Sequence, residues 1–476
     1  MHTWRAPLIV ALTLGLLALV PLQANARAGD PPCPPGTDPN LIGIACVFVN
    51  KTTAGVIAQT TAAMTEQAVA AQEASWLGQA LELQHHLGDA LPWRDAMWVG
   101  THNSFNTDSN VPPTPSNLDS NQHVSLVDQL RLGARGIEID VHWLPSLATG
   151  GAKAPVVCHG QGPDRLDFGC TIERPLYDEL APVSDWLRQP AHRDDVVLLY
   201  LEDNIADPAG FASAAQAIGS TIGDLVYAPP AGGSGCPLLP LDGLTRADVV
   251  AAGKQVVIMS GCGPDGGTGA WRSTVFDDSV RSEEGNPVFA GYPACSSGSV
   301  SAADYGTKLV RFYEDSTFVS AAVALGPGQR LTADEITAMV ECGVNLFGLD
   351  QVGPGDSRLE AMVWSWARSE PSTSVAGTCA IDGALSRYRA APCNGSTLHY
   401  ACVDATGTWS VSTTTGPGSQ EAGDAACAAS HPGTRFAVPG SGGHQQRLTV
   451  AKLAAGIPDV WVAYRVAGGT WQSSAA

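Results

Sequence analysis

Five short segments of this 476-residue chain share one pattern, which constrains its fold more than any other feature. Each lies in or directly after an apolar run of β type and carries polar or ionisable residues at the C-terminal end of that run. The segments are residues 101–105, 136–140, 157–160, 199–203 and 346–350. In a (β/α)8 barrel, the chemistry lies at the C-terminal ends of the strands. The pattern therefore predicts an α/β fold, a TIM-type barrel, with two histidines and a cluster of acids at one mouth.

We expect this barrel to span residues 91–371, and seven of its strands can be assigned. They are residues 96–100, 136–141, 155–158, 196–201, 255–259, 309–313 and 344–349. The remaining strand lies in one of two stretches rich in Gly, Pro and Ser, residues 204–242 or 276–301. Residues 54–87 are rich in Ala, Gln, Glu and Leu, which predicts one or two helices packed on the barrel.

The N-terminus has the features of a secretory signal. Arg5 precedes an apolar run over residues 6–22, and Ala24-Asn25-Ala26 has the small-x-small form of a cleavage site. We therefore expect a signal peptide over residues 1–26 and a secreted or periplasmic protein. Residues 27–90 would form an N-terminal extension closed by a disulfide, followed by helices. No later segment has the roughly 20 apolar residues that a membrane-spanning helix needs, so we expect no transmembrane segment in the mature chain.

Twelve cysteines in an exported chain indicate disulfides, because no C-x-x-C pair with zinc-like spacing occurs. Proximity in the sequence predicts the pairs Cys33–Cys46, Cys158–Cys170 and Cys402–Cys427. The other six cysteines are left unpaired by this argument, although Cys379–Cys393 is an attractive pair among them.

The formal net charge of -20 argues against nucleic acid as a partner and against electrostatic docking on anionic membranes. Solubility is its simplest explanation. If the substrate is a lipid, apolar contacts must bring the protein to the membrane surface transiently.

Residues 136–142 alternate with period two, which places Glu138, Asp140 and His142 on one face. In a barrel, the apolar alternate residues face the helices and the carboxylates point into the lumen. Buried charges are costly unless they are paired or bind a metal. The alternative is a pair of structural acids in salt bridges, although few Lys or Arg residues lie nearby in the sequence.

His102 and His159 each follow a predicted strand at the same end of the barrel. Cleavage of a phosphodiester benefits from a base that activates the attacking hydroxyl and from an acid that protonates the leaving oxygen. Two histidines at one mouth fit these roles, whereas either histidine alone would be weak support.

Asn103, Glu138, Asp140 and Glu202 are all oxygen donors, although Asp203 could take the place of Glu202. Ca²⁺ accepts an irregular set of six to eight oxygens, whereas Mg²⁺ prefers a stricter octahedron. Ligands gathered from three strands therefore favour Ca²⁺. Zinc is less suitable, because the cysteines and histidines have other roles.

With these motifs, residues 91–371 resemble the phosphatidylinositol-specific phospholipase C family of PLC-like phosphodiesterases. The resemblance implies that His102 and His159 are catalytic. The calcium ligands that it implies are Asn103, Glu138, Asp140 and Glu202. Metal-independent bacterial members carry arginine where Asp140 stands, so the chain resembles the calcium-dependent branch.

The implied reaction is cleavage of a phosphoinositide through a cyclic inositol phosphate. His102 would take the proton from the inositol 2-hydroxyl, and His159 would protonate the leaving oxygen. Arg311 would bind the inositol or its phosphate, with an ion pair to Glu314 as the alternative.

Two alternative functions remain open. Glycerophosphodiester phosphodiesterases and sphingomyelinase-D-like enzymes share the barrel, but the former usually begin His-Arg-Gly where residues 102–104 read His-Asn-Ser. A non-catalytic binding protein could also keep the barrel as a scaffold.

The composition changes after a polar linker at residues 372–378. Residues 379–476 resemble a C-type-lectin-like module, which implies a small α+β domain. Sugar-binding lectins usually carry Trp-Asn-Asp, whereas Trp461 is followed by Val462-Ala463. This difference favours a role in stability or protein contact. The linker also predicts that a chain ending near Ser374 keeps its catalytic activity.

Overall fold

The computed structural model describes residues 65–109, 120–160, 162, 170–231, 234–263, 269–317 and 330–473. Residues 68–476 form one compact unit, and the following description concerns that unit. The expected signal peptide and the Cys33–Cys46 pair lie outside the described residues. Within the described part of the chain, no helix has both the length and the apolar character needed to cross a bilayer.

Strands and helices alternate along much of the chain up to residue 361, as expected for an α/β fold. The strands are β1 (Gly136–Pro145), β2 (Lys153–Val157), β3 (Val197–Asn204), β4 (Val256–Ser260), β5 (Phe276–Asp277), β6 (Arg281–Gly285), β7 (Leu309–Tyr313) and β8 (Leu346–Gly348). The α-helices are α4 (Trp76–Leu87), α5 (Leu126–Arg131), α6 (Leu176–Leu187), α7 (Pro208–Thr221), α8 (Arg246–Ala251), α9 (Gly269–Arg272), α11 (Ala333–Cys342) and α12 (Ser357–Ala361). Short 3-10 turns are η3 (Leu147–Thr149), η4 (Cys170–Ile172) and η5 (Pro190–His192).

The strands form two sheets that are connected through residues 98–101. The first has the order β2-β1-β3-β4-β5 and the second β6-β7-β8, and every pairing is parallel except that of β1 with β2. Parallel bridges join Trp98 to Leu346, Gly100 to Gly136, and Thr101 to Leu349. Among the pairings of the described residues, none links β5 to β6. The α/β fold is thus confirmed, whereas full closure into a TIM barrel stays a prediction.

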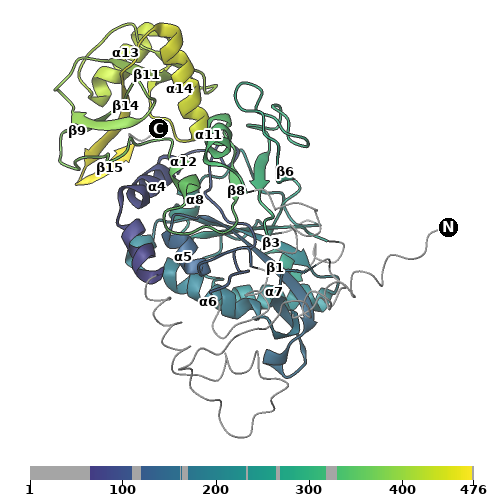
Figure 1. Ribbon diagram of the computed structural model, residues 1–476. Helices are drawn as coiled ribbons and strands as arrows, with labels where there is room; N and C mark the ends of the chain where they lie inside the picture. The colour runs from purple at the N-terminus through teal and green to yellow at the C-terminus, as the bar shows by residue number, and fades with distance from the viewer. Residues whose placement is uncertain are drawn as a thin grey trace, which may run out of the picture. The chain divides into compact units, whose positions relative to one another are not determined.

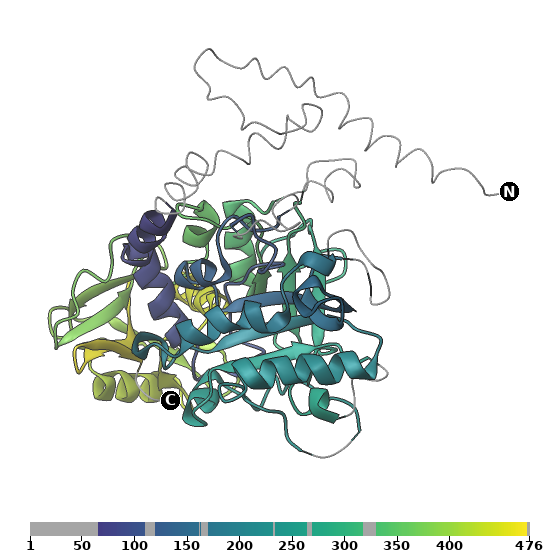
Figure 2. The same cartoon turned by 90° about the horizontal axis from the view of Figure 1, so that it is seen from below.

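Alternate residues of the parallel strands belong to two different hydrophobic clusters. Leu199 and Leu201 of β3 pack with residues of α6 and α7, while Leu198 and Tyr200 pack with Trp98. Figure 1 and Figure 2 show α6 and α7 beside β1 and β3. This period-two division gives the sheet one face toward the helices and one inner face, and the inner face carries the polar residues of the site.

Two strand predictions need correction or completion. The segment predicted at residues 155–158 forms β2, but β2 runs antiparallel to β1 and is not the next parallel strand. The strand that could not be placed lies in the second candidate stretch, where the structure has β5 and β6. Both are short and lie among Gly, Pro and Ser residues, so they show little hydrophobic periodicity.

Five disulfides link the described residues. The predicted pairs Cys158–Cys170 and Cys402–Cys427 are confirmed. The six cysteines left unassigned form Cys379–Cys393, the pairing considered attractive, together with Cys236–Cys262 and Cys295–Cys342. Each of the last two bridges joins consecutive cysteines of the chain, as the confirmed pair Cys402–Cys427 does, so the proximity argument could have been extended to them.

The C-terminal region is an α+β structure with its own mixed sheet of order β10-β9-β14-β11-β12. Its strands are β9 (Thr378–Asp382), β10 (Tyr388–Pro392), β11 (His399–Val403), β12 (Trp409–Val411), β13 (Arg435–Phe436), β14 (Val460–Ala467) and β15 (Thr470–Ser473). Its helices are α13 (Gln420–Ser430) and α14 (Gly442–Ala455). The resemblance to a C-type-lectin-like module stays a prediction.

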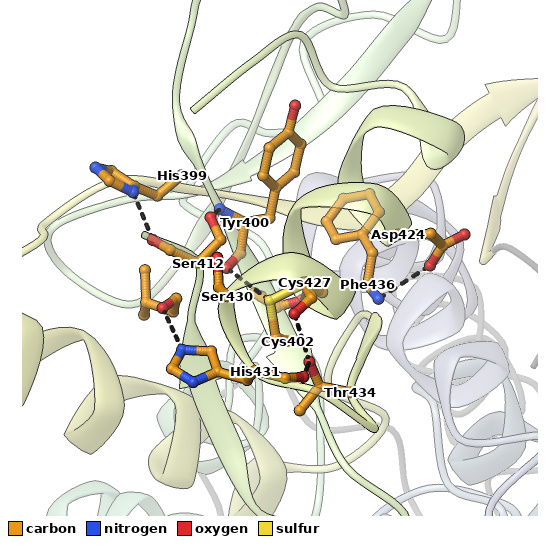
Figure 3. Close-up of a disulfide and its surroundings, with 12 residues drawn as sticks. His399, Tyr400, Cys402, Ser412, Asp424, Cys427, Ser430, His431, Thr434 and Phe436 are labelled. Atoms are coloured by element: carbon orange, nitrogen blue, oxygen red, sulfur yellow. Dashed lines mark hydrogen bonds between the residues drawn. A yellow bond between two sulfur atoms is a disulfide. The ribbon is translucent and has the colours of Figure 1, made fainter. Parts of the chain in front are cut away.

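The Cys402–Cys427 disulfide attaches α13 to β11, and hydrogen bonds surround it (Figure 3). Thr434 Oγ1 donates to the carbonyl oxygen of Cys427 at 3.1 Å. The backbone N–H of Phe436 donates to Asp424 Oδ1 at 3.1 Å, which holds β13 against the same helix. These contacts make α13, β11 and β13 one compact layer.

The C-terminal region also shares a hydrophobic cluster with the preceding part of the chain. The ring of Trp366 lies 4.7 Å from Trp471 and 5.8 Å from Tyr388, measured between centroids. The N–H of Tyr388 donates to the carbonyl of Ser365 at 2.7 Å. Helix α14 packs next to α11 (Figure 1), so closely that a Cβ at Gly443 would lie 3.0 Å from an atom of Gly343. The residues on both sides of the linker therefore stabilise one another.

This shared cluster changes the expected effect of truncation. We expect a chain ending at Ser374 to aggregate or to lose its fixed tertiary structure, because removal of the partners of Trp366 would expose a large apolar surface. Gel filtration and near-UV circular dichroism, with the full chain as control, would test this. A monomeric truncated protein with an unchanged near-UV spectrum would instead support the independent domain predicted from the linker.

Candidate active site

Backbone pairing brings the predicted site residues to one end of the parallel strands. The N–H of His102 donates to the carbonyl of Leu349 at 3.0 Å, at the end of β8. The N–H of Ser104 donates to the carbonyl of Glu138 at 3.0 Å, on β1. The segment after residue 101 thus lies between the end of β8 and strand β1. Its side chains contact residues at the ends of both strands.

His102 forms a buried pair with Asp350. The distance between His102 Nδ1 and Asp350 Oδ1 is 3.1 Å, and the Asp350 side chain is fully buried. Burial alone would lower the pKa of His102, but the nearby carboxylates of Asp350 and Glu138 outweigh it and raise this pKa to about 9. The carboxylate also orients the imidazole and leaves Nε2 as the ring nitrogen that can exchange a proton with another group.

Three further groups hold the Asp350 carboxylate. Asn121 Nδ2 donates to Asp350 Oδ1 at 3.1 Å, and the N–H and Oγ of Ser316 donate to Oδ2 at 2.7 and 3.0 Å. Gln122 Nε2 donates to the carbonyls of His102 and Leu349 at 2.7 and 2.8 Å, which secures the bridge between their strands. Sequence reasoning missed these residues. Asp350 ends one of the five recognised segments, which was a usable signal, whereas Asn121, Gln122 and Ser316 carry none.

The ladder between β1 and β3 places two acids side by side. Asp140 is the register partner of Glu202, so their side chains share a face. The two carboxyl groups interact directly, and burial together with Glu202 raises the pKa of Asp140 well above its ordinary value. Asp203 lies one residue further along, where strand alternation turns it to the other face. The register therefore favours Glu202 over Asp203 as the partner of Asp140.

Asn103 lies between His102 and Asp140 in a left-handed backbone conformation with φ of 45°. One terminal atom of its amide is 3.0 Å from each Asp140 carboxylate oxygen, and the other is 3.3 Å from His102 Nε2. With nitrogen toward Asp140, the amide hydrogen-bonds both groups. With oxygen toward Asp140, the neighbouring oxygens need a cation between them.

Arg311 neutralises Glu138, the third of the acids predicted to bind calcium. Its Nη2 donates to Glu138 Oε2 at 2.6 Å, and its Nη1 donates to Glu283 Oε2 at 2.7 Å. The guanidinium carbon lies 4.5 Å from the ring centroid of Tyr313, and the residue is only 4 % exposed. Glu138 thus has the salt bridge that was the alternative to metal binding. A role for Arg311 in substrate binding stays a prediction.

The alternative ion pair between Arg311 and Glu314 is wrong. Glu314 instead accepts a hydrogen bond from Arg358 Nη1 at 2.5 Å, and the backbone N–H of Asp350 donates to it at 2.6 Å. Strand alternation explains the difference, because residues 311 and 314 differ by an odd number of positions and lie on opposite faces. Glu283, the second partner of Arg311, lies on β6, which the sequence did not place.

His159 reaches the site by an antiparallel route. Strand β1 extends beyond Asp140, and β2 turns back along it, so that Cys158 donates its N–H to the Asp140 carbonyl at 3.3 Å. The Cys158–Cys170 disulfide fixes this end of β2. His159 follows directly and is exposed to solvent. It therefore lies near the level of the acids, although its strand runs opposite to the one that was expected.

Only some of the predicted calcium ligands are arranged in a way that suits a cation. Asn103, Asp140 and Glu202 supply oxygens, and the contact between two carboxyl groups calls for either a proton or a cation. Glu138 is turned toward Arg311. Among the described residues, the three predicted acids do not form a group whose ligand atoms all lie within 4.8 Å; the group that does is Glu82, His86 and Asp195.

The negative charges of Glu82 and Asp195 in that second group are already balanced without a metal. Arg135 Nη2 donates to Glu82 at 2.8 Å, and Arg135 Nε donates to Asp195 at 3.2 Å. Burial opposes the charge on His86, but Asp89 and Glu82 raise its pKa to about 10, so it is protonated at neutral pH. A protonated imidazole is not a metal ligand. We interpret this group as a structural network.

Comparison with known proteins identifies the family. A family model described as the Rv2075c PI-PLC-like domain matches residues 57–356. Uncharacterized protein Rv2075c of Mycobacterium tuberculosis strain ATCC 25618 / H37Rv is 36 % identical over 491 residues, which cover 96 % of this chain and 97 % of that protein. Uncharacterized protein MT2135 of strain CDC 1551 / Oshkosh gives the same identity and coverage.

The solved structures that match are more remote. Phosphatidylinositol-specific phospholipase C from Listeria monocytogenes is 15 % identical, with a TM-score of 0.37, over 58 % of this chain and 96 % of that chain. A calcium-dependent phosphoinositol-specific phospholipase C from Pseudomonas sp. is 16 % identical, with a TM-score of 0.29, over 57 % and 92 %. Such low scores indicate remote similarity only. The family model and the full-length relatives, in contrast, cover most of the chain, which therefore belongs to the Rv2075c PI-PLC-like family.

Proposed function

We propose that the protein is an exported, calcium-dependent phosphoric diester hydrolase that cleaves a phosphoinositide and releases a cyclic inositol phosphate. The observation that carries the proposal is the buried His102–Asp350 pair, whose imidazole lies beside the oxygen donors Asn103 and Asp140. Membership of a PI-PLC-like family supports the substrate class. In this proposal, the parallel strands close into a TIM-type barrel around the site.

In the proposed reaction, His102 accepts the proton of the inositol 2-hydroxyl through Nε2. Because the pKa of His102 is about 9, its neutral form, which acts as the base, is the minor form near pH 7. The oxygen of that hydroxyl bonds to the adjacent phosphorus, and the bond from phosphorus to the diacylglycerol oxygen breaks. His159 gives a proton to the leaving oxygen, so the products are a cyclic inositol phosphate and diacylglycerol. Asp350 holds the imidazole in one tautomer and stabilises its charged form. The exposed position of His159 suits contact with a leaving group at the mouth.

Asn103, Asp140 and Glu202 would hold the calcium ion, with Glu138 as a fourth ligand if it exchanges Arg311 for the metal. When bound, Ca²⁺ would stabilise negative charge on the phosphate and favour ionisation of the attacking hydroxyl. Arg311 supplies a fixed positive charge beside the same acids.

Contact with lipid would be transient and apolar. The net charge of -20 disfavours electrostatic attraction to an anionic bilayer. Leu147 of η3 and Ile172 of η4 are 66 % and 51 % exposed, and these two turns pack together beyond the β1–β2 hairpin. They offer an apolar surface at the turn of the hairpin that carries Asp140, to which Leu147 belongs and against which η4 packs. The disulfides support export, because such bonds persist in oxidising compartments.

Product analysis tests the proposal against its alternatives. The full-length protein would be incubated with phosphatidylinositol vesicles and calcium, and the phosphorus products identified by ³¹P NMR. A cyclic inositol phosphate is expected. Release of glycerol or choline from other diesters would indicate the related phosphodiesterases, and no turnover of any diester would indicate a binding protein.

We expect His102→Ala and His159→Ala each to reduce turnover by at least about a hundredfold, the scale for loss of a positioned base or acid. His123→Ala is the matched control, because His123 forms a similar pair with Asp108 at 3.0 Å on the surface. Initial rates on a soluble inositol phosphodiester provide the measurement. Near-normal rates in either variant would remove that histidine from the mechanism.

Asp350→Asn should lower turnover by at least about a hundredfold while KM changes little, because the amide can favour the wrong imidazole tautomer. Asp108→Asn serves as the control for replacing an aspartate that contacts a histidine. The thermal unfolding midpoint is recorded alongside the kinetics. A folded Asp350→Asn protein with normal turnover would show that the buried pair is structural only.

We expect a calcium chelator to abolish activity and added Ca²⁺ to restore it. Asp140→Asn removes one ligand charge and should shift the calcium midpoint of activity to higher concentration. Asp203→Asn, on the other face of β3, should leave that midpoint unchanged. Full activity in excess chelator would contradict the calcium assignment.

A further inference from the structure

A cavity lies away from the proposed active site, between residues 91–95 and the C-terminal region. Its volume is about 780 Å³. Residues 91–95 form one wall, and the turn between β11 and β12 together with α14 forms another. Asp95 lies at the beginning of the segment that ends at His102. Seven residues of extended chain span roughly 20 Å, so the cavity and the site are separate.

Two arginines at this cavity are not in direct ion pairs with a carboxylate of the described residues. Arg435 and Arg447 are exposed and form no ion pair with any described residue, although most other cations of this acidic chain do. The acids that line the cavity also have partners other than these arginines, although Asp95 favours the charged form of Arg447 electrostatically. Asp95 lies 3.5 Å from Arg94 Nε, and the Asp404 carboxylate accepts hydrogen bonds within its own turn, including one from the Thr406 N–H at 2.8 Å. Among the residues that line the cavity, Arg94, Arg435 and Arg447 outnumber the two aspartates, Asp95 and Asp404, so the lining carries a net positive charge.

The same wall carries neutral polar groups and an aromatic ring. Burial, reinforced by the Arg447 charge, lowers the pKa of His444 to about 3, so its imidazole is neutral. Its ring lies 6.3 Å from that of Trp409, and its side chain makes no hydrogen bond to the described residues. The hydroxyls of Thr406 and Thr408 lie 2.9 Å apart at the rim. Such groups donate to or accept from ligand hydroxyls.

We propose that this cavity binds a sugar that carries a phosphate or carboxylate group. The two arginines would hold the anionic group, since a guanidinium matches the planar or tetrahedral oxygens of such groups. His444 and the threonine hydroxyls would contact the sugar hydroxyls, and the exposed ring of Tyr292 would cover an apolar sugar face. The proposal is independent of the proposed hydrolase activity.

Isothermal titration calorimetry of the full-length protein would test this with four probes: glucose 6-phosphate, glucuronate, glucose and inorganic phosphate. We expect glucose 6-phosphate or glucuronate to bind, and to bind at least about tenfold more tightly than glucose or inorganic phosphate. Tighter binding of glucose 6-phosphate would identify the ligand as a sugar phosphate. Tighter binding of glucuronate would identify it as an acidic sugar.

Arg435→Gln and Arg447→Gln should each weaken this binding at least about tenfold. Arg465→Gln is the matched control, because Arg465 is also exposed and without a carboxylate partner among the described residues but does not line the cavity. Arg447→Lys should restore part of the affinity if loss of charge is the cause. Hydrolase activity should not change in any of these variants.

The absence of binding by both anionic sugars at millimolar concentration would overturn the proposal. Equal affinities in the wild type, Arg435→Gln and Arg447→Gln would place the ligand elsewhere and also overturn it. If glucose binds as tightly as the charged sugars, the anionic group does not contribute to binding. If inorganic phosphate binds as tightly as the charged sugars, the sugar does not contribute. Either result refutes the cavity as a site for anionic sugars.

Discussion

The ion pair between Arg311 and Glu138 is the interaction on which the arrangement of the site depends. Both side chains are buried, and an unpaired charge in that position would cost several kcal/mol. Arg311 also binds Glu283, so one guanidinium connects β1, β6 and β7. The Glu138 carboxylate accepts the N–H of Asn103 at 3.3 Å, which fixes the residue next to His102. The position of His102 thus depends on a cation from the other sheet, β6-β7-β8.

This pair leaves two acids without a fixed positive partner of their own. Asp140 and Glu202 face each other across the β1–β3 ladder, and burial makes the charged form of both less favourable. A shared proton or a divalent cation would relieve this cost. The site therefore combines a permanent internal cation with an acidic pair that can accept a further one. The proposed calcium binding uses that second property.

Local pattern predicted where several residues of the candidate site lie in the fold. The alternation at residues 136–142 placed Glu138 and Asp140 on the inner face, and the change from apolar to polar residues at strand ends brought out His102 and Glu202. The partner of Arg311 was not predictable in this way, because Glu138 is 173 positions away and the intervening β6 has no apolar periodicity. The direction of β2 depends on the turn after Pro145 and not on its own composition. Residues such as Asn121 act only through tertiary contacts, and these leave no trace in the local sequence.

The bridges from Trp98 and Thr101 to the β8 region also determine when the site can form. His102 and Asp350 are 248 positions apart, so their pair requires nearly the whole barrel region to be present and folded. Contacts of such long sequence separation form slowly, because chain entropy must be lost before they stabilise the fold. An unfolded chain contains every side chain of the candidate site but not their arrangement. The topology therefore couples formation of the candidate site to the completion of folding.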